Sequence, residues 1–262
     1  MLAIKMNNVD QYWADRGLPV DEDSRFELKY RLTYFQYLKM RNAIQPYMVM
    51  DPFTSVQASK RYLVRSLYFD TYDYRQFHQK MNGDSDRAKF RFRTYPYGEE
   101  YQSHVRVELK IRQGNYSIKK SVFVSMGEYE HFMATRHWQA VEDPITNAFE
   151  RQMLRQGLRP MVLVEYEREG YQPRLKSNLR LTFDHRVRGS HAKSLFPEKS
   201  FYRYLYPRSV VLEIKFNDTL PNWLEALVRS QGLKVIANSK YTQSFLIARN
   251  DLHHPGNVIL VR

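Results

Sequence analysis

Eight segments of the chain have the hydrophobic pattern of β-strands, and in five of them charged residues alternate with apolar ones. In residues 104–112, for example, Arg106, Glu108 and Lys110 share one side of the strand, and valine and leucine side chains fill the other. The eight predicted strands are residues 25–32, 62–70, 88–95, 104–112, 116–125, 161–168, 178–187 and 209–217.

The segments between these strands predict six helices, and strands outnumber long helical connections. The predicted helices are residues 34–48, 73–80, 126–138, 144–157, 220–231 and 240–250. The short turn Gln113-Gly114-Asn115 predicts a hairpin between the fourth and fifth strands. These features favour a mainly antiparallel α+β fold. We expect one domain over residues 25–262, preceded by a lead-in segment over residues 1–24.

The charged face is the unusual feature of the five alternating strands. One such strand alone is equally compatible with a solvated outer face. Five strands with the same habit favour a curved sheet that gathers the charged side chains in one lumen. We therefore predict an eight-stranded antiparallel β tunnel, a closed barrel with the charges inside and the helices packed on the outside.

The charge balance indicates an anionic partner. The 262 residues include 41 Lys and Arg against 28 Asp and Glu, for a formal net charge of +13.

There is no cysteine, which excludes disulfides, thiolate metal sites and cysteine nucleophiles. The sequence has neither a signal-peptide pattern nor an apolar stretch of about 18 residues that could span a membrane. We expect a soluble, cytoplasmic protein.

A lumen lined mainly with cations would be unstable when dry and empty, because like charges repel and unpaired ammonium groups lose hydration. Triphosphate and polyphosphate supply dense negative charge in a narrow shape, whereas double-stranded nucleic acid is too wide. Three carboxylates, Glu27, Glu108 and Glu213, share the charged faces. They either pair with neighbouring cations or hold Mg²⁺ or Mn²⁺ beside phosphate.

Motifs on these strands resemble the triphosphate tunnel metalloenzymes (the CYTH-like superfamily), specifically the branch of VTC-type polyphosphate polymerases. Arg25-Phe-Glu27-Leu-Lys29-Tyr30 resembles the opening strand of this family, and Ser239-Lys240-Tyr241 resembles its closing element. The other matches, in chain order, are Tyr68-Phe69-Asp70-Thr71, Lys89-Phe-Arg91-Phe-Arg93-Thr-Tyr95, Glu108-Leu-Lys110, Lys120-Ser121, Tyr166-Glu-Arg168, Arg180-Leu-Thr-Phe-Asp184 and Leu212-Glu213-Ile-Lys215-Phe216.

The resemblance implies a basic tunnel that transfers the γ-phosphate of ATP, or of another nucleoside triphosphate, to a growing inorganic polyphosphate chain. It implies that Glu213 binds Mn²⁺ or Mg²⁺, and we add Glu27 and Glu108 as candidate metal ligands. We also expect Lys89, Tyr95 and Ser239 to bind substrate. The residues expected to act on phosphates are Lys29, Arg91, Arg93, Lys110, Lys120, Arg168, Arg180, Lys215 and Lys240.

Two positions depart from the pattern. The wider superfamily often opens with Glu-x-Glu-x-Lys, and Arg25 replaces the first glutamate, which suits the polymerase branch better than the hydrolase branch. The alternation also leaves open whether Lys119 or Lys120 faces the lumen.

Mechanistically, we expect Arg91, Arg93 and Lys110 to grip the donor phosphates. Lys29, Lys120, Arg168 and Arg180 would hold the acceptor chain. The alternatives are a triphosphatase, a non-catalytic polyphosphate or nucleotide sensor, and a basic binder of RNA or a membrane surface. Nucleic acid is the less favoured ligand, because the aromatic residues alternate opposite the charges.

Overall fold

The computed structural model describes residues 26–96, 104–113 and 116–249. The predicted lead-in segment therefore lies outside the described residues. The strands are β1 (Phe26–Thr33), β2 (Met48–Met50), β3 (Tyr62–Asp70), β4 (Arg87–Thr94), β5 (His104–Gln113), β6 (Tyr116–Ser125), β7 (Arg159–Pro173), β8 (Arg180–His191), β9 (Arg203–Tyr204) and β10 (Ser209–Phe216). The helices are α2 (Tyr34–Ala43), α3 (Pro52–Ser55), α4 (Arg75–Met81), α5 (Met126–Thr135), α6 (Pro144–Gln156), α7 (Asn222–Ser230) and α8 (Lys240–Arg249).

One antiparallel sheet organises the molecule, and its main path follows the order β1-β10-β8-β7-β3-β4-β5-β6. Each strand on this path corresponds to one of the eight predicted strands, and β5 pairs with β6 as the predicted hairpin requires. Two short strands were not predicted: β2 pairs with β7, and β9 pairs with β8. The mainly antiparallel α+β class is thus confirmed.

The predicted closed barrel is not confirmed, because the sheet does not close by hydrogen bonds. Among the described residues β1 and β6 are the two ends of the strand path and do not pair with each other. Instead, the segment before α8 covers the outer edge of β1: Tyr30 bridges to Val235, and the Ile236 amide donates to the Lys29 carbonyl at 2.8 Å. At these positions the edge of β1 bonds to this segment and not to β6.

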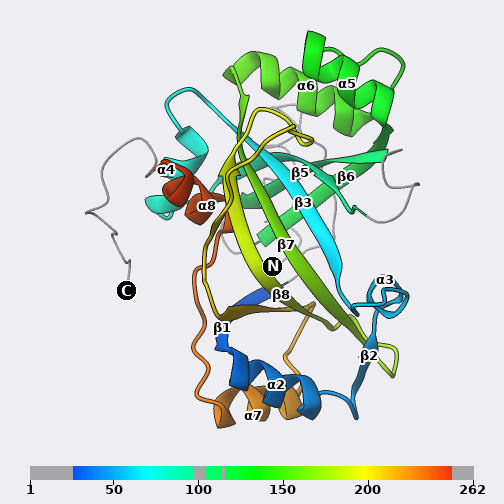
Figure 1. Cartoon of the computed structure of the whole chain (residues 1–262), viewed down its shortest axis with the longest axis vertical. Helices are drawn as coiled ribbons and strands as arrows, with labels where there is room; N and C mark the ends of the chain where they lie inside the picture. The colour runs from blue at the N-terminus through cyan, green and yellow to red at the C-terminus, as the bar shows by residue number, and fades with distance from the viewer. Residues whose placement is uncertain (1–25, 97–103, 114–115, 250–262) are drawn as a thin grey trace, which may run out of the picture.

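Two apolar layers cover the sheet face opposite the charges. Helices α5 and α6 pack Phe132 and Phe149 against Phe92 and its neighbours on β3, β4 and β5. Helices α2 and α7 cover β1, β8 and β10 in the same way. Figure 1 shows these two helix pairs at opposite ends of the molecule. The apolar half of the alternation thus faces outward onto helices, as predicted.

A third apolar cluster lies on the same sheet face as the charges. There α8 packs Tyr241 and Phe245 against Tyr68 on β3 and against valines of β7, β8 and β10. Helix α4 lies beside α8, with Phe77 at 4.6 Å from Phe245 between ring centroids. Part of the predicted lumen is therefore filled by a helix, and its N-terminal residues reach the charged part.

The helix boundaries follow local capping signals. Thr33 and Gln36 form a reciprocal capping box at the start of α2. Asp143 caps α6, Pro144 occupies its first turn, and Gly157 ends the helix in a left-handed conformation. The predicted helix 34–48 is shorter than expected, because α2 stops at Ala43 and the chain returns as β2.

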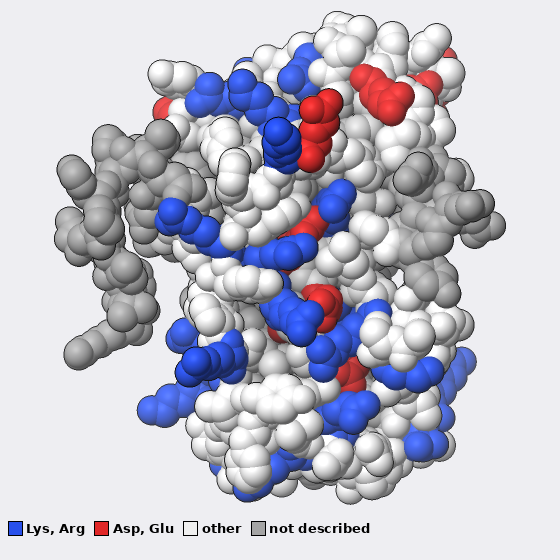
Figure 2. Space-filling view, in the orientation of Figure 1, with Lys and Arg blue, Asp and Glu red and all other residues white. Residues whose placement is uncertain are grey.

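The outer face of β7 carries charges that neutralise one another. Glu165 accepts from Arg65 at 2.5 Å and from Arg188 at 2.7 Å. Glu167 contacts Arg186 at 3.1 Å, and Glu169, two residues further on, binds further arginines. Figure 2 shows basic and acidic side chains interleaved along this side of the molecule. Surface charge here is largely paired, in contrast to the cavity behind the strands.

Candidate functional site

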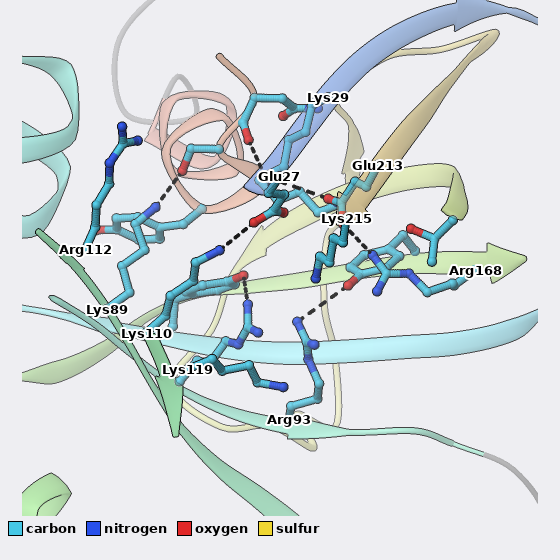
Figure 3. Close-up of a pocket in the computed structure, with 18 of the residues that line it drawn as sticks. Glu27, Lys29, Lys89, Arg93, Lys110, Arg112, Lys119, Arg168, Glu213 and Lys215 are labelled. Atoms are coloured by element: carbon cyan, nitrogen blue, oxygen red, sulfur yellow. Dashed lines mark hydrogen bonds and ion pairs between the residues drawn. The ribbon is translucent and has the colours of Figure 1, made fainter. Parts of the chain in front are cut away.

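A cavity of about 530 Å³ lies on the charged face of the sheet. Its walls come from β1, β3, β4, β5, β6, β7, β8 and β10, together with α4 and the start of α8. Figure 3 shows basic side chains from these elements pointing toward one another. The fourteen cations that line the cavity are Lys29, Lys80, Arg87, Lys89, Arg91, Arg93, Arg106, Lys110, Arg112, Lys119, Arg168, Arg180, Lys215 and Lys240.

The strand register explains this convergence. In antiparallel pairs, directly opposite residues share a face. Lys110 on β5 lies opposite Lys89 on β4 and Lys119 on β6. Lys215 on β10 lies opposite Arg180 on β8. Like charges in such positions oppose folding, so the sheet holds together here in spite of its charged face.

Glu108 is the counter-ion of the β4–β6 wall. Its side chain is fully buried and accepts from Arg91, while Lys119 lies at 2.7 Å and Arg93 at 3.8 Å. Burial alone would raise the pKa of Glu108, but the charges of Arg91, Arg93 and Lys119 hold it well below its usual range. The carboxylate is therefore charged, and four cations share its one negative charge, because Arg106 also lies at 4.0 Å.

Glu213 occupies the equivalent position on the opposite wall. Lys240 Nζ lies 2.5 Å from its carboxylate, Arg168 Nη2 lies at 3.0 Å and Lys29 Nζ at 3.8 Å. Arg168 and Lys240 also bind Asp184, at 2.6 Å each. Burial raises the pKa of Glu213, yet Lys240, Lys29 and Arg168 keep it well below the usual value. The start of α8 is thus tied to the sheet by charge.

Glu27 joins two strands that share no hydrogen bonds. It lies 3.2 Å from Lys29 Nζ and 2.7 Å from Lys110 Nζ, so it connects β1 to β5 across the open side of the sheet. Burial raises the pKa of Glu27, but the lysine charges around it dominate and lower it well below normal. An ion pair therefore takes the place of a closing strand pair.

Lys215 is a cation that the cavity makes hard to keep charged. Burial lowers its pKa to about 7, because the attraction of Glu27 and Glu213 does not offset desolvation and the repulsion of Lys110. A bound polyanion would favour the charged form. The cavity is thus complementary to a ligand with more negative charge than its own carboxylates supply.

The carboxylates permit one candidate metal site. Glu27 and Glu213 approach the same ammonium group, that of Lys29, so the position between them already suits positive charge. Two carboxylates completed by phosphate oxygens and water suit Mg²⁺ or Mn²⁺. Glu108 fits less well, because arginines and Lys119 surround it, and the described residues contain no cluster of three acidic or histidine side chains. Glu108 fits the other predicted role better, which is to pair with neighbouring cations.

Nearly all the predicted site residues lie in this cavity. It brings together Glu27, Lys29, Lys89, Arg91, Arg93, Tyr95, Lys110, Arg168, Arg180, Glu213, Lys215, Ser239 and Lys240. There are two exceptions: Glu108 lies behind the cavity wall, bound to Arg91, and β6 places Lys120 opposite Leu109 on the apolar face. Lys119, opposite Lys110, points into the cavity and takes its place.

Several lining residues were not predicted as site residues. Arg87, Arg106 and Arg112 have the same parity as the predicted residues of their strands, so the alternation could have found them. Lys80 comes from the last turn of α4. Nothing in a short helix between two strands indicates that one of its lysines turns toward the charged face.

Comparisons with known proteins identify one family. The VTC domain family matches residues 24–248. No curated protein gives a significant match. Among the described residues, no helix has the length and apolar character that a membrane crossing requires.

Three solved structures are similar at low identity. A proposed adenylate cyclase from Bacillus halodurans shares 13% identity at a TM-score of 0.48, over 84% of this chain and 95% of that one. A proposed adenylyl cyclase from Hippeastrum, described as having a dominant triphosphatase activity, shares 14% at 0.44, over 87% and 96%. The Mimivirus capping enzyme triphosphatase shares 10% at 0.32, over 86% and 94%. It is the family match, over most of its length, that assigns the chain: it belongs to the VTC domain family.

Proposed function

We propose that the chain transfers the terminal phosphate of a nucleoside triphosphate to inorganic polyphosphate inside the cavity. The observation that carries this proposal is the uncompensated charge of the walls. Fourteen lysines and arginines line the cavity, while Glu27 and Glu213 are the carboxylates that line it with them. Even with Asp51, Glu108 and Asp184 behind the wall, fourteen cations face five carboxylates. A slender polyanion is the ligand that neutralises such a surface.

The reaction needs positioning and charge more than covalent chemistry from the protein. Arg91 and Arg93 present planar guanidinium groups that can pair with phosphate oxygens in a bidentate way. Lys110 and Lys240 add point charges where the charge of the transferred group develops. A phosphate oxygen of the acceptor chain is already anionic and attacks without a base.

The state of the carboxylates favours transfer over hydrolysis. Water needs a base, yet Glu27, Glu108 and Glu213 each have a pKa well below normal and each bind cations. A carboxylate with such a low pKa is a weak proton acceptor. Glu213 and Glu27 would hold a divalent cation, which when bound supplies further neutralisation of the phosphates.

The direct test is incubation of the pure protein with ATP and Mn²⁺ or Mg²⁺, with the products resolved on a gel. We expect ADP and chains much longer than triphosphate. Orthophosphate without such chains would indicate a triphosphatase instead. Tight binding with no product at all would indicate a sensor.

A matched pair of variants separates the cavity from general basicity. Lys119→Met removes a lining cation, and Lys120→Met removes its neighbour on the apolar face. We expect turnover to fall by about tenfold to a hundredfold in the first and to stay within about twofold in the second. Glu213→Gln should abolish turnover while polyphosphate binding persists.

A further inference from the structure

A second hollow, of about 420 Å³, lies on the outer face of the sheet. Arg61 lines this outer hollow and contacts Glu167 on the outer face of β7, whereas its neighbour Tyr62 lines the charged cavity. His185 also lines the outer hollow, and its neighbour Asp184 binds the other way, to Lys240 of the cavity wall. Because neighbouring residues of a strand point to opposite faces, the sheet separates the outer hollow from the cavity.

Three arginines line the outer hollow, and among the described residues no carboxylate lines it with them. Arg61 lies 3.7 Å from Glu167 and 3.8 Å from Glu169, so its ion pairs are long. Arg186 lies 3.1 Å from Glu167. Arg208, on the loop that leads into β10, forms no ion pair with a described residue. The outer hollow therefore has guanidinium donors left for an anion.

The backbone holds two of these arginines in a conformation that side chains seldom adopt. The φ angle is 49° at Arg186 and 67° at Arg208, both in the left-handed region. Among the described residues five non-glycine positions have a positive φ, and two of them line this one hollow. Strained positions of this kind gather at ligand-binding sites, where the surrounding structure imposes them.

Tyrosine rings form much of the remaining wall. Tyr34, at the start of α2, is 57% exposed, and Tyr204 on β9 is 49% exposed. Tyr206 also lines the outer hollow, and the guanidinium group of Arg31 already stacks on its ring at 4.7 Å. Nucleic-acid bases stack on tyrosine rings, and phosphate groups pair with arginine in a bidentate way. The volume is within the range of small-molecule pockets, roughly 300–1,000 Å³.

We infer that the outer hollow binds a nucleoside phosphate, with its base against Tyr34 and Tyr204 and its phosphates on Arg61, Arg186 and Arg208. The charged cavity offers fourteen cations and suits a dense polyanion, whereas this hollow offers three arginines beside aromatic rings and suits a base that carries few phosphates. The inference does not depend on the proposed function, because the sheet separates the two sites.

Photolabelling locates the site directly. The full chain is irradiated with an azidoadenine analogue of ADP, in EDTA to prevent turnover, and the tryptic peptides are analysed by mass spectrometry. Peptides 32–39 and 204–208 contain Tyr34 and Tyr204 and no residue that lines the cavity. We expect label on these peptides, and we expect it to persist when inorganic triphosphate fills the cavity. Label confined to cavity peptides, or lost together with theirs when triphosphate is added, overturns the inference.

A matched pair of arginine variants tests the phosphate contacts. Arg208→Asn removes the guanidinium group, and asparagine adopts the left-handed conformation more readily than most residues. Arg136→Asn is the control, because Arg136 has a φ of 68° at the end of α5 and does not line the outer hollow. Calorimetry with ADP, in EDTA and triphosphate, should show about tenfold weaker binding for Arg208→Asn and a change within about twofold for the control. Equal changes in the two variants overturn the site.

Tyr204→Leu tests the contact with the base. We expect it to weaken ADP binding about tenfold, because a stacked base is lost, while the affinity for pyrophosphate stays within about twofold. An equal loss for ADP and pyrophosphate, or no loss for ADP, would contradict the assignment of the outer hollow to a nucleoside phosphate.

Discussion

Lys89 lines the cavity, and burial and nearby cations lower the pKa of its ammonium group. Burial and the neighbouring charges of Lys29 on β1, Lys110 on β5 and Lys80 on α4 favour its neutral form. The unfolded chain keeps the ordinary lysine pKa of about 10.4. Between the two values the unfolded state binds more protons, so this group makes stability rise with pH. Below the ordinary lysine pKa, Lys89 therefore costs stability, and the cost disappears as the pH of the solution approaches that value.

The prediction is that Lys89→Gln stabilises the ligand-free protein near neutral pH, and that the gain shrinks as the pH rises toward 10. Glutamine keeps an N–H donor, on a side chain one bond shorter than that of lysine, so the substitution mainly removes the charge beside the Ser239 hydroxyl. Urea unfolding at a series of pH values measures it. Polyphosphate affinity should fall over the same pH range in the wild type and more weakly in the variant. A pH-independent difference between the two proteins would contradict the argument.

Glu108 gives the opposite prediction at the residue scale. It is fully buried and serves Arg91, Arg93 and Lys119 together. Glu108→Gln leaves these cations without their shared counter-ion, and we expect a loss of about 3 kcal/mol in unfolding free energy. Saturating triphosphate should restore part of it by supplying the missing charge. Thermal unfolding with and without triphosphate checks both parts, and an equal loss under the two conditions would argue against a charge-based role.

For single residues, the sequence pattern predicted which side chains face the cavity in most strands, but not in β6 or in α4. A period of two placed Arg91, Lys110 and Lys215 on the cavity side correctly, because strand geometry fixes side-chain direction. It left Lys119 and Lys120 undecided, since the direction of β6 depends on its register with β5 and not on its own pattern. It said nothing of Lys80, whose position depends on how α4 packs.

At the scale of elements, the contact between α8 and β8 controls the site. A Cβ on Gly189 would lie 2.5 Å from the Ser244 Cβ and 3.1 Å from its Cα, so the helix backbone packs directly on the strand. Gly189→Ala must push α8 outward and draw Lys240 away from Glu213 and Asp184. We expect a loss of about 1–3 kcal/mol in stability and a loss of turnover beyond what partial unfolding explains.

Gly127→Ala is the matched control, because the nearest atom to its added Cβ is the Ser125 hydroxyl oxygen at 4.0 Å. This glycine lies in α5, where alanine should be neutral or stabilising by up to about 1 kcal/mol. Circular dichroism melts and turnover of both variants make the comparison. If Gly189→Ala were as well tolerated as the control, α8 would not be held by this close contact.

The elements themselves were largely readable from the sequence, because five of the eight strands alternate charged with apolar residues and the other three also have a strand-like hydrophobic pattern. The position of α8 was not readable. A helix over residues 240–250 was predicted, but the sequence could not show that it packs Tyr241 and Phe245 on the charged face. The predicted closure of the barrel was not confirmed for a related reason. The segment with Val235 and Ile236 pairs with the edge of β1, and such pairing depends on tertiary contacts that the strand pattern does not contain.

In the whole molecule, charges on the outer face of β7 are paired, whereas the cavity has more cations than carboxylates. On the outer face of β7 each glutamate binds arginines, while the cavity leaves most of its fourteen cations to share Glu27, Glu108, Glu213 and Asp184. Among the described residues, a large excess of positive charge therefore lies where a ligand would bind. Ligand-free stability should be limited by this repulsion, and any dense anion that enters should relieve it.

This leads to a prediction for the intact protein. Triphosphate at about 100 times its dissociation constant should add about 2.7 kcal/mol to the unfolding free energy. An equal ionic strength of sodium chloride should add much less, because the walls hold their charges closer together than the screening length of about 10 Å at 0.1 M. Thermal shift with triphosphate, chloride and single-stranded DNA at matched charge makes the measurement. A ranking with DNA first would point to an open basic surface, since a cavity of about 530 Å³ admits a phosphate chain more easily than stacked bases.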